Sequence, residues 1–278
     1  MPSFDNSLPE ALRDRIEFDK TQARDTGRLG NHIIRVIDKV TGPAYLKIGS
    51  GIAAQDLLDE SDRLDWIGDR LPVPQVLFRD ARDGWAYVLI SELSGGPSHE
   101  AFNAISIPTA IEKLAEGLRR IHAVPIDDCP FDRVLENELE ESARRIGTPG
   151  LDVDAFIADT GTEPGQLLDR LVAQASTIVG DVVFTHGDYC FPNLLLNGTE
   201  ISGIVDWGIA GISDINRDFM SIELTVQRNC GTEWVPAFYE AYGPVEADPE
   251  RIRFFWLLDR FFSHYADSPS VDRLAAMP

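Results

Sequence analysis

The stretch Val182–Gly208, VVFTHGDYCFPNLLLNGTEISGIVDWG, decides the fold that we expect for this chain. Short apolar runs that predict strands alternate in it with polar residues that can carry chemistry. Asp188 ends a His-Gly-Asp sequence, Asn193 follows after four intervening residues, and Asp206 lies thirteen positions beyond Asn193 and begins Asp-Trp-Gly. This ordered set of two carboxylates and one amide is typical of a magnesium-dependent phosphoryl transferase.

The three residues suit different parts of that chemistry. Asp188 lies in a loop after a predicted strand, and we expect it to accept the proton of the acceptor hydroxyl as general base. Asn193 and Asp206 offer a neutral and an anionic oxygen, which are hard ligands suited to Mg²⁺. Asn197-Gly198 predicts a hairpin turn that would bring them together. His186 is expected to brace the loop by hydrogen bonding, since Asp188 already fits the base.

Length and composition restrict the class of protein. A chain of 278 residues can form one large domain or two lobes with their own cores. No apolar run approaches the roughly 20 residues that a membrane helix needs. The first residues lack the pattern of a secretory signal, and Cys129, Cys190 and Cys230 are too widely spaced for a disulfide framework or zinc cluster. We therefore expect a cytoplasmic protein.

The charge is strongly acidic. There are 46 Asp and Glu residues against 25 Lys and Arg, a formal net charge of −21. Such a surface repels nucleic acids and anionic membranes, so neither is an expected partner. It would attract a polycationic small molecule, but acidity that serves only solubility or salt adaptation remains an equal alternative. The sequence leaves the oligomeric state open.

The first part of the chain is predicted to be rich in strands. A capping box at Ser7 and Glu10 predicts a helix that runs toward Phe18. The glycine-spaced turn Thr26–Gly30 could face a phosphate, although a turn without a ligand is the commoner reading. Alternation and turn residues predict strands at 32–37, 44–48, 76–78 and 85–90, and helical spacing predicts one helix at 53–68.

Beyond Ser94–Pro97 the chain becomes mostly helical. Apolar periodicity predicts helices near residues 111–121, 135–146, 166–178, 218–227, 235–242 and 249–262. We expect an α+β fold with a small, β-rich N-terminal lobe at 1–95 that binds nucleotide. A hinge at 91–96 would lead to a larger, mostly helical lobe at 96–278 with the catalytic loop, metal site and substrate cleft.

Lys47, on the second predicted strand, is the candidate phosphate clamp. An isolated lysine on a strand is more often a solvated edge residue, but the downstream motif favours the functional reading. Glu60, on the following predicted helix, could pair with Lys47 and hold its ammonium on the α- and β-phosphates. Asp59 is next to it in the sequence but would point about 100° away on a helix.

The chain resembles the aminoglycoside phosphotransferase family, specifically its 3′-hydroxyl branch, which has the bilobal protein-kinase fold. The similarity spans nearly the whole chain. It is carried by AYLKIG around Lys47, LPVPQV, DGWAYVLISEL, VVFTHGDYCFPNLLL, ISGIVDWGIAGISDINRDF and FFWLLDRFF.

The resemblance implies a role for each matching position. Asp188 would be the catalytic residue, Asn193 and Asp206 would hold magnesium, with two ions expected, and Lys47 and Glu60 would anchor the phosphates of ATP, with GTP remaining open. Ser91 and Leu93 would lie on the hinge whose backbone contacts adenine. Asp214 and Asp218 match structural acids, to which we assign no chemistry.

The substrate residues are fewer. Asp159 and Asp259 match acids that in the family neutralise the drug's ammonium groups. However, Phe156–Ala158 are apolar where relatives are more polar, Arg260 stands where a Glu commonly follows the terminal acid, and Arg228 falls where several relatives carry an acid. These departures could mean a narrower or less cationic substrate, or an enzyme whose activity on the drug is incidental.

We expect an ATP-dependent O-phosphotransferase that modifies the 3′-hydroxyl of aminoglycosides and so gives resistance. A kinase of the same fold acting on another antibiotic, or on a sugar or amino-alcohol metabolite, is the first alternative, and Arg228 and Arg260 favour it. A nucleotide-binding regulator without turnover is the second. Intact Lys47, Asp188, Asn193 and Asp206 oppose that second alternative.

Overall fold

The structure, a computed structural model, describes residues 8–18, 31–100, 105–133, 135–148, 150–178 and 180–264. The chain divides into two compact units. Unit 1 comprises Met1–Ala104 and Pro192–Ile209, and unit 2 comprises Ile105–Phe191 and Ala210–Pro278. The segment 192–209, which sequence analysis placed in the second lobe, thus groups with the first part of the chain, while the hinge at 91–96 stays a prediction.

Unit 1 is built on a five-stranded antiparallel sheet in the order β1-β2-β3-β5-β4. The strands are β1 (Ile16–Phe18), β2 (Asn31–Asp38), β3 (Gly42–Ser50), β4 (Val76–Arg82) and β5 (Trp85–Ser91). The four predicted strands therefore exist. Because β3 lies between β2 and β5, a lysine on it is not an edge residue, and that alternative for Lys47 is wrong.

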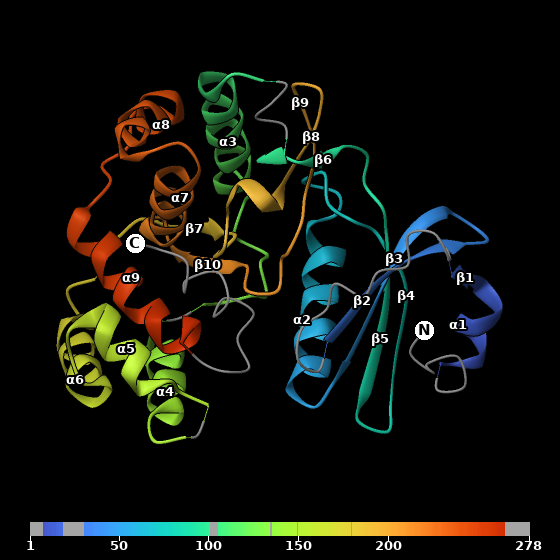
Figure 1. Ribbon diagram of the computed structural model, residues 1–278, viewed down its shortest axis with the longest axis horizontal. Coiled ribbons are helices and arrows are strands. Elements are labelled where there is room, and N and C mark those ends of the chain that lie inside the picture. The colour runs from blue at the N-terminus through green and yellow to red at the C-terminus, as the bar shows by residue number, and fades with distance from the viewer. Residues whose placement is uncertain are drawn as a thin grey trace. The chain divides into compact units, whose positions relative to one another are not determined.

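The helix α2 (Ile52–Ile67) packs along β3, β5 and β4 (Figure 1). Its buried residues Leu57, Leu64 and Ile67 recur at helical spacing and cover the sheet. The helix begins after Gly51, whose φ of 60° is a left-handed value that glycine adopts without a steric cost. This packing fixes the side of the helix that faces the sheet, which carries Glu60.

One predicted helix is shorter than expected. The helix α1 covers only Glu10–Arg15, and Ile16–Phe18 form β1, whose Ile16 pairs with Asp38 of β2. Arg15 donates from Nε and Nη2 to the two carboxylate oxygens of Asp38 at 2.9 and 2.8 Å, which ties the end of the helix to the sheet. The partner that overrides helix propensity is thus distant in sequence, and Ser7 of the predicted capping box lies outside the described residues.

A second, three-stranded sheet of unit 1 has the order β6-β8-β9, with β6 (Gly96–Pro97), β8 (Leu194–Asn197) and β9 (Glu200–Ile204). The predicted hairpin at Asn197-Gly198 is confirmed, with Gly198 at a φ of 63°. Pairing of Gly96 with Leu196 explains why this hairpin groups with unit 1.

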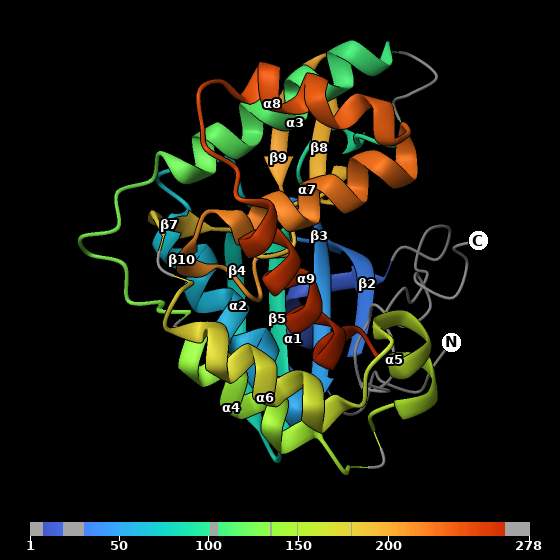
Figure 2. The same ribbon diagram turned by 90° about the vertical axis from the view of Figure 1, so that its left-hand side faces the viewer.

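Unit 2 is mostly helical. It contains α3 (Ile107–His122), α4 (Leu135–Arg145), α5 (Val153–Thr160), α6 (Pro164–Ala175), α7 (Asn216–Asn229), α8 (Val235–Tyr242) and α9 (Pro249–Ser263), with the strands β7 (Val182–Thr185) and β10 (Gly211–Asp214). The two strands pair antiparallel. Figure 2 shows α9, in red, running beside α7, and α9 also contacts α4, α5 and α6. The elements α5, β6 and β10 were not predicted from the sequence.

None of the helices in the described part of the chain is long and apolar enough to span a bilayer. The three cysteines lie within the described ranges, and none of them forms a disulfide bond. The glycine-spaced turn Thr26–Gly30 falls outside those ranges.

Candidate active site

Lys47 and Glu60 form a buried ion pair in unit 1. Lys47 Nζ donates to both oxygens of Glu60, at 2.8 and 2.6 Å, and both residues are 7% exposed. The pair joins the middle of β3 to α2, so the ammonium has a fixed position on the sheet. Asp59 instead bonds to Gln55 at the helix surface, as its place on the helix predicted.

The charge of Lys47 is set by opposing effects. Burial lowers the pKa of its ammonium, while the carboxylates of Glu60 and Asp206 and the Glu60 hydrogen bonds raise it, and the net shift is upward. Lys47 is therefore a cation at neutral pH. Because Asp206 acts on this ammonium, the structure brings together a residue of β3 and a residue that lies more than 150 positions later in the sequence.

The hairpin of unit 1 positions Asn193 and Asp206. Asn193 ends the 3-10 turn Phe191–Asn193 just before β8, and its carbonyl accepts the amide of Val205 at 2.9 Å. Asn193 is buried, whereas Asp206 is exposed and has a φ of 70°. The structure thus brings the two predicted magnesium residues to one end of the hairpin.

The donor set fits magnesium rather than a metal held by the protein alone. Among the described residues there is no group of three or more His, Cys, Asp and Glu side chains suited to a metal ion. Mg²⁺ is commonly held by one or two protein oxygens together with substrate phosphates. One amide, one exposed carboxylate and a nearby ammonium are consistent with that mode of binding.

Ser91 and Leu93 lie at and just after the end of β5. The amide of Ser91 donates to the carbonyl of Gln75 at 2.9 Å, and its hydroxyl oxygen accepts the amide of Gln75 at 2.9 Å. Leu93 packs on Gly203 of β9, where an added Cβ would lie 2.3 Å from Leu93 Cδ1. Glu92 lies between these two residues and pairs with Arg35 at 2.7 Å. The Arg35 hydrogen bond holds the pKa of Glu92 below its usual value.

Asp188 lies in unit 2, in the loop after β7. It is exposed, and its amide donates to Nδ1 of buried His186 at 3.3 Å, so His186 does brace the loop. Gly187, between them, has a φ of 85°. The left-handed glycine turns the chain so that the side chain of Asp188 is exposed while its neighbours are buried.

Asp218 anchors this loop, and sequence analysis gave it no chemistry. It is fully buried on α7, and its carboxylate accepts the amides of Gly187 at 2.7 Å and His186 at 2.9 Å. Its Oδ2 also lies 3.0 Å from Nε2 of His122. Burial raises the pKa of Asp218, but the bonds and charge of His122 and the His186 amide outweigh burial and lower it, so the anchor is a carboxylate. The sequence signal was an acid on the apolar face of a predicted helix.

The two predicted substrate acids lie close together in unit 2. Asp159 lies in the last turn of α5 and Asp259 lies on α9, and both bind Arg260 of α9, at 3.0 and 2.7 Å. His264 Nε2 lies 3.0 Å from the same oxygen of Asp159. The pKa of Asp159 stays below its usual value, because the bonds of His264 and Arg260 outweigh the opposing effect of burial. Both acids are thus paired within the protein.

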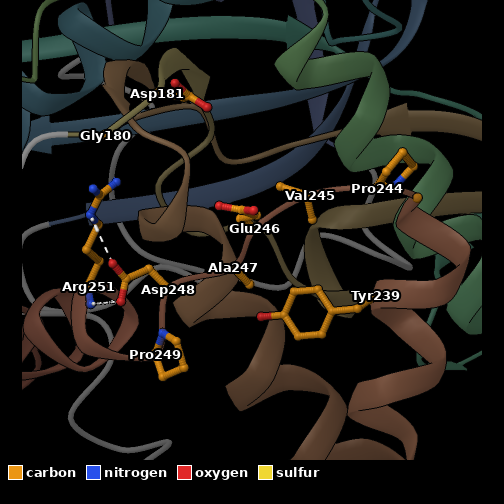
Figure 3. Close-up of a pocket in the computed structure, with 11 residues that line it drawn as sticks. Gly180, Asp181, Tyr239, Pro244, Val245, Glu246, Ala247, Asp248, Pro249 and Arg251 are labelled. Atoms are coloured by element: carbon orange, nitrogen blue, oxygen red, sulfur yellow. Dashed lines mark hydrogen bonds and ion pairs between the residues drawn. The ribbon is translucent and has the colours of Figure 1, made fainter.

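A separate pocket of about 970 Å³ in unit 2 contains none of the predicted site residues (Figure 3). Its lining residues include Asp181, Tyr239, Glu246, Asp248 and Arg251. Arg251 bonds to Asp248 of the pocket at 3.3 Å and to Asp214, which does not line it, at 3.4 Å. Arg251 and Arg260 are thus two arginines of α9 that each bind two aspartates.

Comparison with known proteins gives the class. The model of the phosphotransferase enzyme family matches residues 22–255, so this chain belongs to the phosphotransferase enzyme family. An aminoglycoside 3′-phosphotransferase of Niallia circulans is 31% identical over 256 residues, which cover 91% of this chain and 97% of that protein.

Two solved structures resemble this chain to a nearly equal degree. One is an aminoglycoside 3′-phosphotransferase of type VIII, with 25% identity, a TM-score of 0.74 and coverage of 94% of this chain and 100% of that chain. The other is the phosphotransferase APH(3″)-Id of Streptomyces rimosus in complex with ADP and streptomycin, with 26% identity, a TM-score of 0.75 and coverage of 94% and 99%. They confirm the predicted α+β, kinase-like fold and a phosphotransferase enzyme.

Proposed function

We propose that this protein transfers the γ-phosphoryl group of ATP to a hydroxyl of an aminoglycoside, most directly the 3′-hydroxyl, and thereby gives resistance to the drug. The observation that carries the proposal is the buried pair of Lys47 and Glu60 with Asp206 acting on the same ammonium. A strand lysine kept charged in this way is suited to the α- and β-phosphates of a nucleotide.

In unit 1, Lys47 binds the phosphates and Glu60 keeps its ammonium in place. Asn193 and Asp206 would hold Mg²⁺, which would neutralise charge on the phosphate oxygens. The backbone of Ser91 and Leu93 contacts adenine.

In unit 2, Asp188 orients the acceptor hydroxyl and takes its proton. The hydroxyl oxygen forms the new bond to the γ-phosphorus, the bond from that phosphorus to the β–γ bridging oxygen breaks, and ADP leaves with the electron pair. Asp218 is a positioning residue, because it holds the amides of the two residues before Asp188.

The acceptor is proposed to be cationic. Asp159 and Asp259 lie together and retain side-chain exposures of 33% and 37%, so their free lone pairs can accept hydrogen bonds from ammonium groups. The net charge of −21 favours a polycationic small molecule over nucleic acid or an anionic membrane. We place the enzyme in the cytoplasm, where ATP is present.

A second candidate acceptor follows from Arg260. Because this arginine already binds Asp159 and Asp259, a less cationic acceptor is also favoured, such as a streptomycin-type drug modified at 3″ or an amino-alcohol. Similarity to the 3″ enzyme supports it as well as similarity to the 3′ enzyme supports the first.

An assay of ADP release tests both. The purified chain is given ATP and Mg²⁺ with kanamycin-, neomycin- and streptomycin-type drugs and simple amino-alcohols, and NMR of the product identifies the phosphorylated hydroxyl. Drug-dependent ADP release with phosphate at 3′ is the expected result. Release with an amino-alcohol alone would replace the proposed acceptor, and no release with any hydroxyl compound would contradict the activity.

A further inference from the structure

Arg260 is the cation at the centre of the proposed substrate acids. It is 2% exposed, and its guanidinium donates from Nη1 to Asp159 Oδ2 at 3.0 Å and from Nη2 to Asp259 Oδ2 at 2.7 Å. A single planar guanidinium thus bridges two carboxylates on two helices, α5 and α9. Arginine suits such a bridge because its donors have a fixed fork geometry.

Neighbouring groups hold this bridge in place. The Trp256 ring lies 4.8 Å from Arg260 Cζ, on the same helix. Ser263 Oγ donates to Asp259, and His264 Nε2 lies 3.0 Å from Asp159. The guanidinium is therefore fixed by packing and by its partners, and it cannot leave the acids without breaking several contacts.

The bridge changes the charge that a substrate meets. Two carboxylates and one guanidinium leave one net negative charge, whereas the same acids without the guanidinium would present two. A first substrate ammonium can still be attracted by the exposed carboxylate edges. A second ammonium finds no uncompensated carboxylate and is repelled by the guanidinium.

We propose that Arg260 is a specificity-determining residue that competes with substrate ammonium groups for Asp159 and Asp259. The inference rests on the proposed function and narrows its substrate. The favoured acceptor is an aminoglycoside that places one ammonium group together with hydroxyl groups at these acids, and not one that places two or more ammonium groups there.

A structural role alone would act differently. If Arg260 only tied α5 to α9, its loss would alter the binding of all acceptors by a similar factor. The proposed role changes the difference between acceptors of unequal charge. Matched pairs of drugs separate the two roles, such as neomycin with paromomycin and kanamycin B with kanamycin A, which differ within each pair by an amine in place of a hydroxyl.

The test compares Arg260→Gln with the wild type on both pairs. Steady-state kinetics should show the KM of the amine member of at least one pair lowered roughly tenfold, because a carboxylate is released to an added ammonium. The KM of its hydroxyl partner and of ATP, and kcat, should stay within about twofold of the wild type. Arg251→Gln is the matched control, since it removes an arginine of α9 that also binds two aspartates, and it should leave every KM unchanged.

The outcomes are distinct. Equal shifts of KM for both members of each pair, or no shift, would overturn the inference. If the wild type phosphorylates none of the drugs, the proposed function is overturned instead. In that case calorimetric titration measures the Kd of each drug for the wild type and for Arg260→Gln. The amine member of a pair should again bind more tightly to the variant, and its hydroxyl partner should not. If Arg260→Gln does not fold, Arg260→Lys provides the second test. Its ammonium can hold one acid, so a smaller shift of roughly threefold in the same direction is expected, and no shift would overturn the inference.

Discussion

Asp206 combines an unusual backbone conformation with a charge that acts on Lys47. It is one of two described non-glycine residues with a positive φ, and its carboxylate acts on the buried ammonium of Lys47. Asp and Asn tolerate the left-handed conformation better than other side chains with a Cβ. A substitution that tests the charge of Asp206 must therefore accept the left-handed backbone conformation. Asn accepts this conformation better than Ala does.

Replacing Asp206 with Asn should remove the magnesium dependence of nucleotide binding. The neutral amide keeps the backbone conformation but lacks the anionic ligand. Thermal unfolding with ATP, with and without Mg²⁺, measures the effect: the wild type should be stabilised further by Mg²⁺, and the variant should not. Asp83→Asn is the matched control, because Asp83 is the other described aspartate with a positive φ, at 52°. A variant that retains the full magnesium shift would show that Asp206 is not a ligand.

Replacing Asp188 with Asn should lower kcat by roughly 10²–10⁴-fold, the usual contribution of a positioned general base. The amide has nearly the same size, so stabilisation by ATP should persist. Asp181→Asn, an exposed aspartate just before β7, should keep wild-type activity. Turnover of the Asp188 variant at more than about a tenth of the wild-type rate would refute the assignment of the base.

At the scale of elements, the catalytic loop depends on α7. The Asp218 carboxylate accepts two loop amides, and a carboxylate that accepts such bonds while buried is costly to replace. An amide at this position can accept at one atom only, and its NH₂ group would face a donor. The loop would then lose a bond directly before Asp188.

Asp218→Asn should therefore lower kcat by about 100-fold without a comparable rise in the KM of ATP, since a small misplacement of a catalytic group has this effect. The pKa of Asp218 is lowered in the folded state. Its stabilisation is thus present above the unfolded value of about 3.9 and is lost as the pH falls through the folded value. The variant should have a lower free energy of unfolding than the wild type at neutral pH. This free energy should also fall less steeply as the pH is lowered. Exposed Asp169→Asn is the control, and equal kcat in both variants would contradict the anchor.

Gly203 tests the contact between β9 and the residue after β5. An alanine Cβ would lie 2.3 Å from Leu93 Cδ1, so the Leu93 side chain must shift. Because Cδ1 is the end of a flexible, half-buried side chain, the cost should lie near the lower end of the roughly 1–3 kcal/mol of overpacking. Gly203→Ala should raise the KM of ATP, measured by steady-state kinetics, and lower the melting temperature, measured by thermal unfolding. Gly96→Ala, on β6 of the same sheet with its nearest contact at 3.9 Å, should be nearly neutral. A normal KM of ATP for Gly203→Ala would show that the contact between Gly203 and the Leu93 side chain does not position the nucleotide site.

At the scale of the whole molecule, local patterns predicted most elements and the chemistry of Val182–Gly208. The strands, the hairpin and the pairing of Lys47 with Glu60 follow from periodicity and residue type. Features that depend on distant partners were not predicted, such as β1, which Asp38 and Arg15 hold on the sheet. The contacts of Asp218 and Arg260 are of the same kind. Their partners are up to 101 positions away, and no periodicity identifies them.

The net charge of −21 also belongs to the whole molecule and gives the last prediction. An acidic surface attracts a polycation over long range, and salt screens that attraction, since the Debye length falls from about 10 Å at 0.1 M to 3 Å at 1 M. The kcat/KM for a polycationic aminoglycoside should fall roughly tenfold between 0.05 and 0.5 M KCl, while that for an amino-alcohol with one charge should fall by less than about threefold. ATP is an anion, so its KM with Mg²⁺ should not rise in parallel. Equal salt dependence for both acceptors would show that the acidic surface serves solubility and does not attract the substrate.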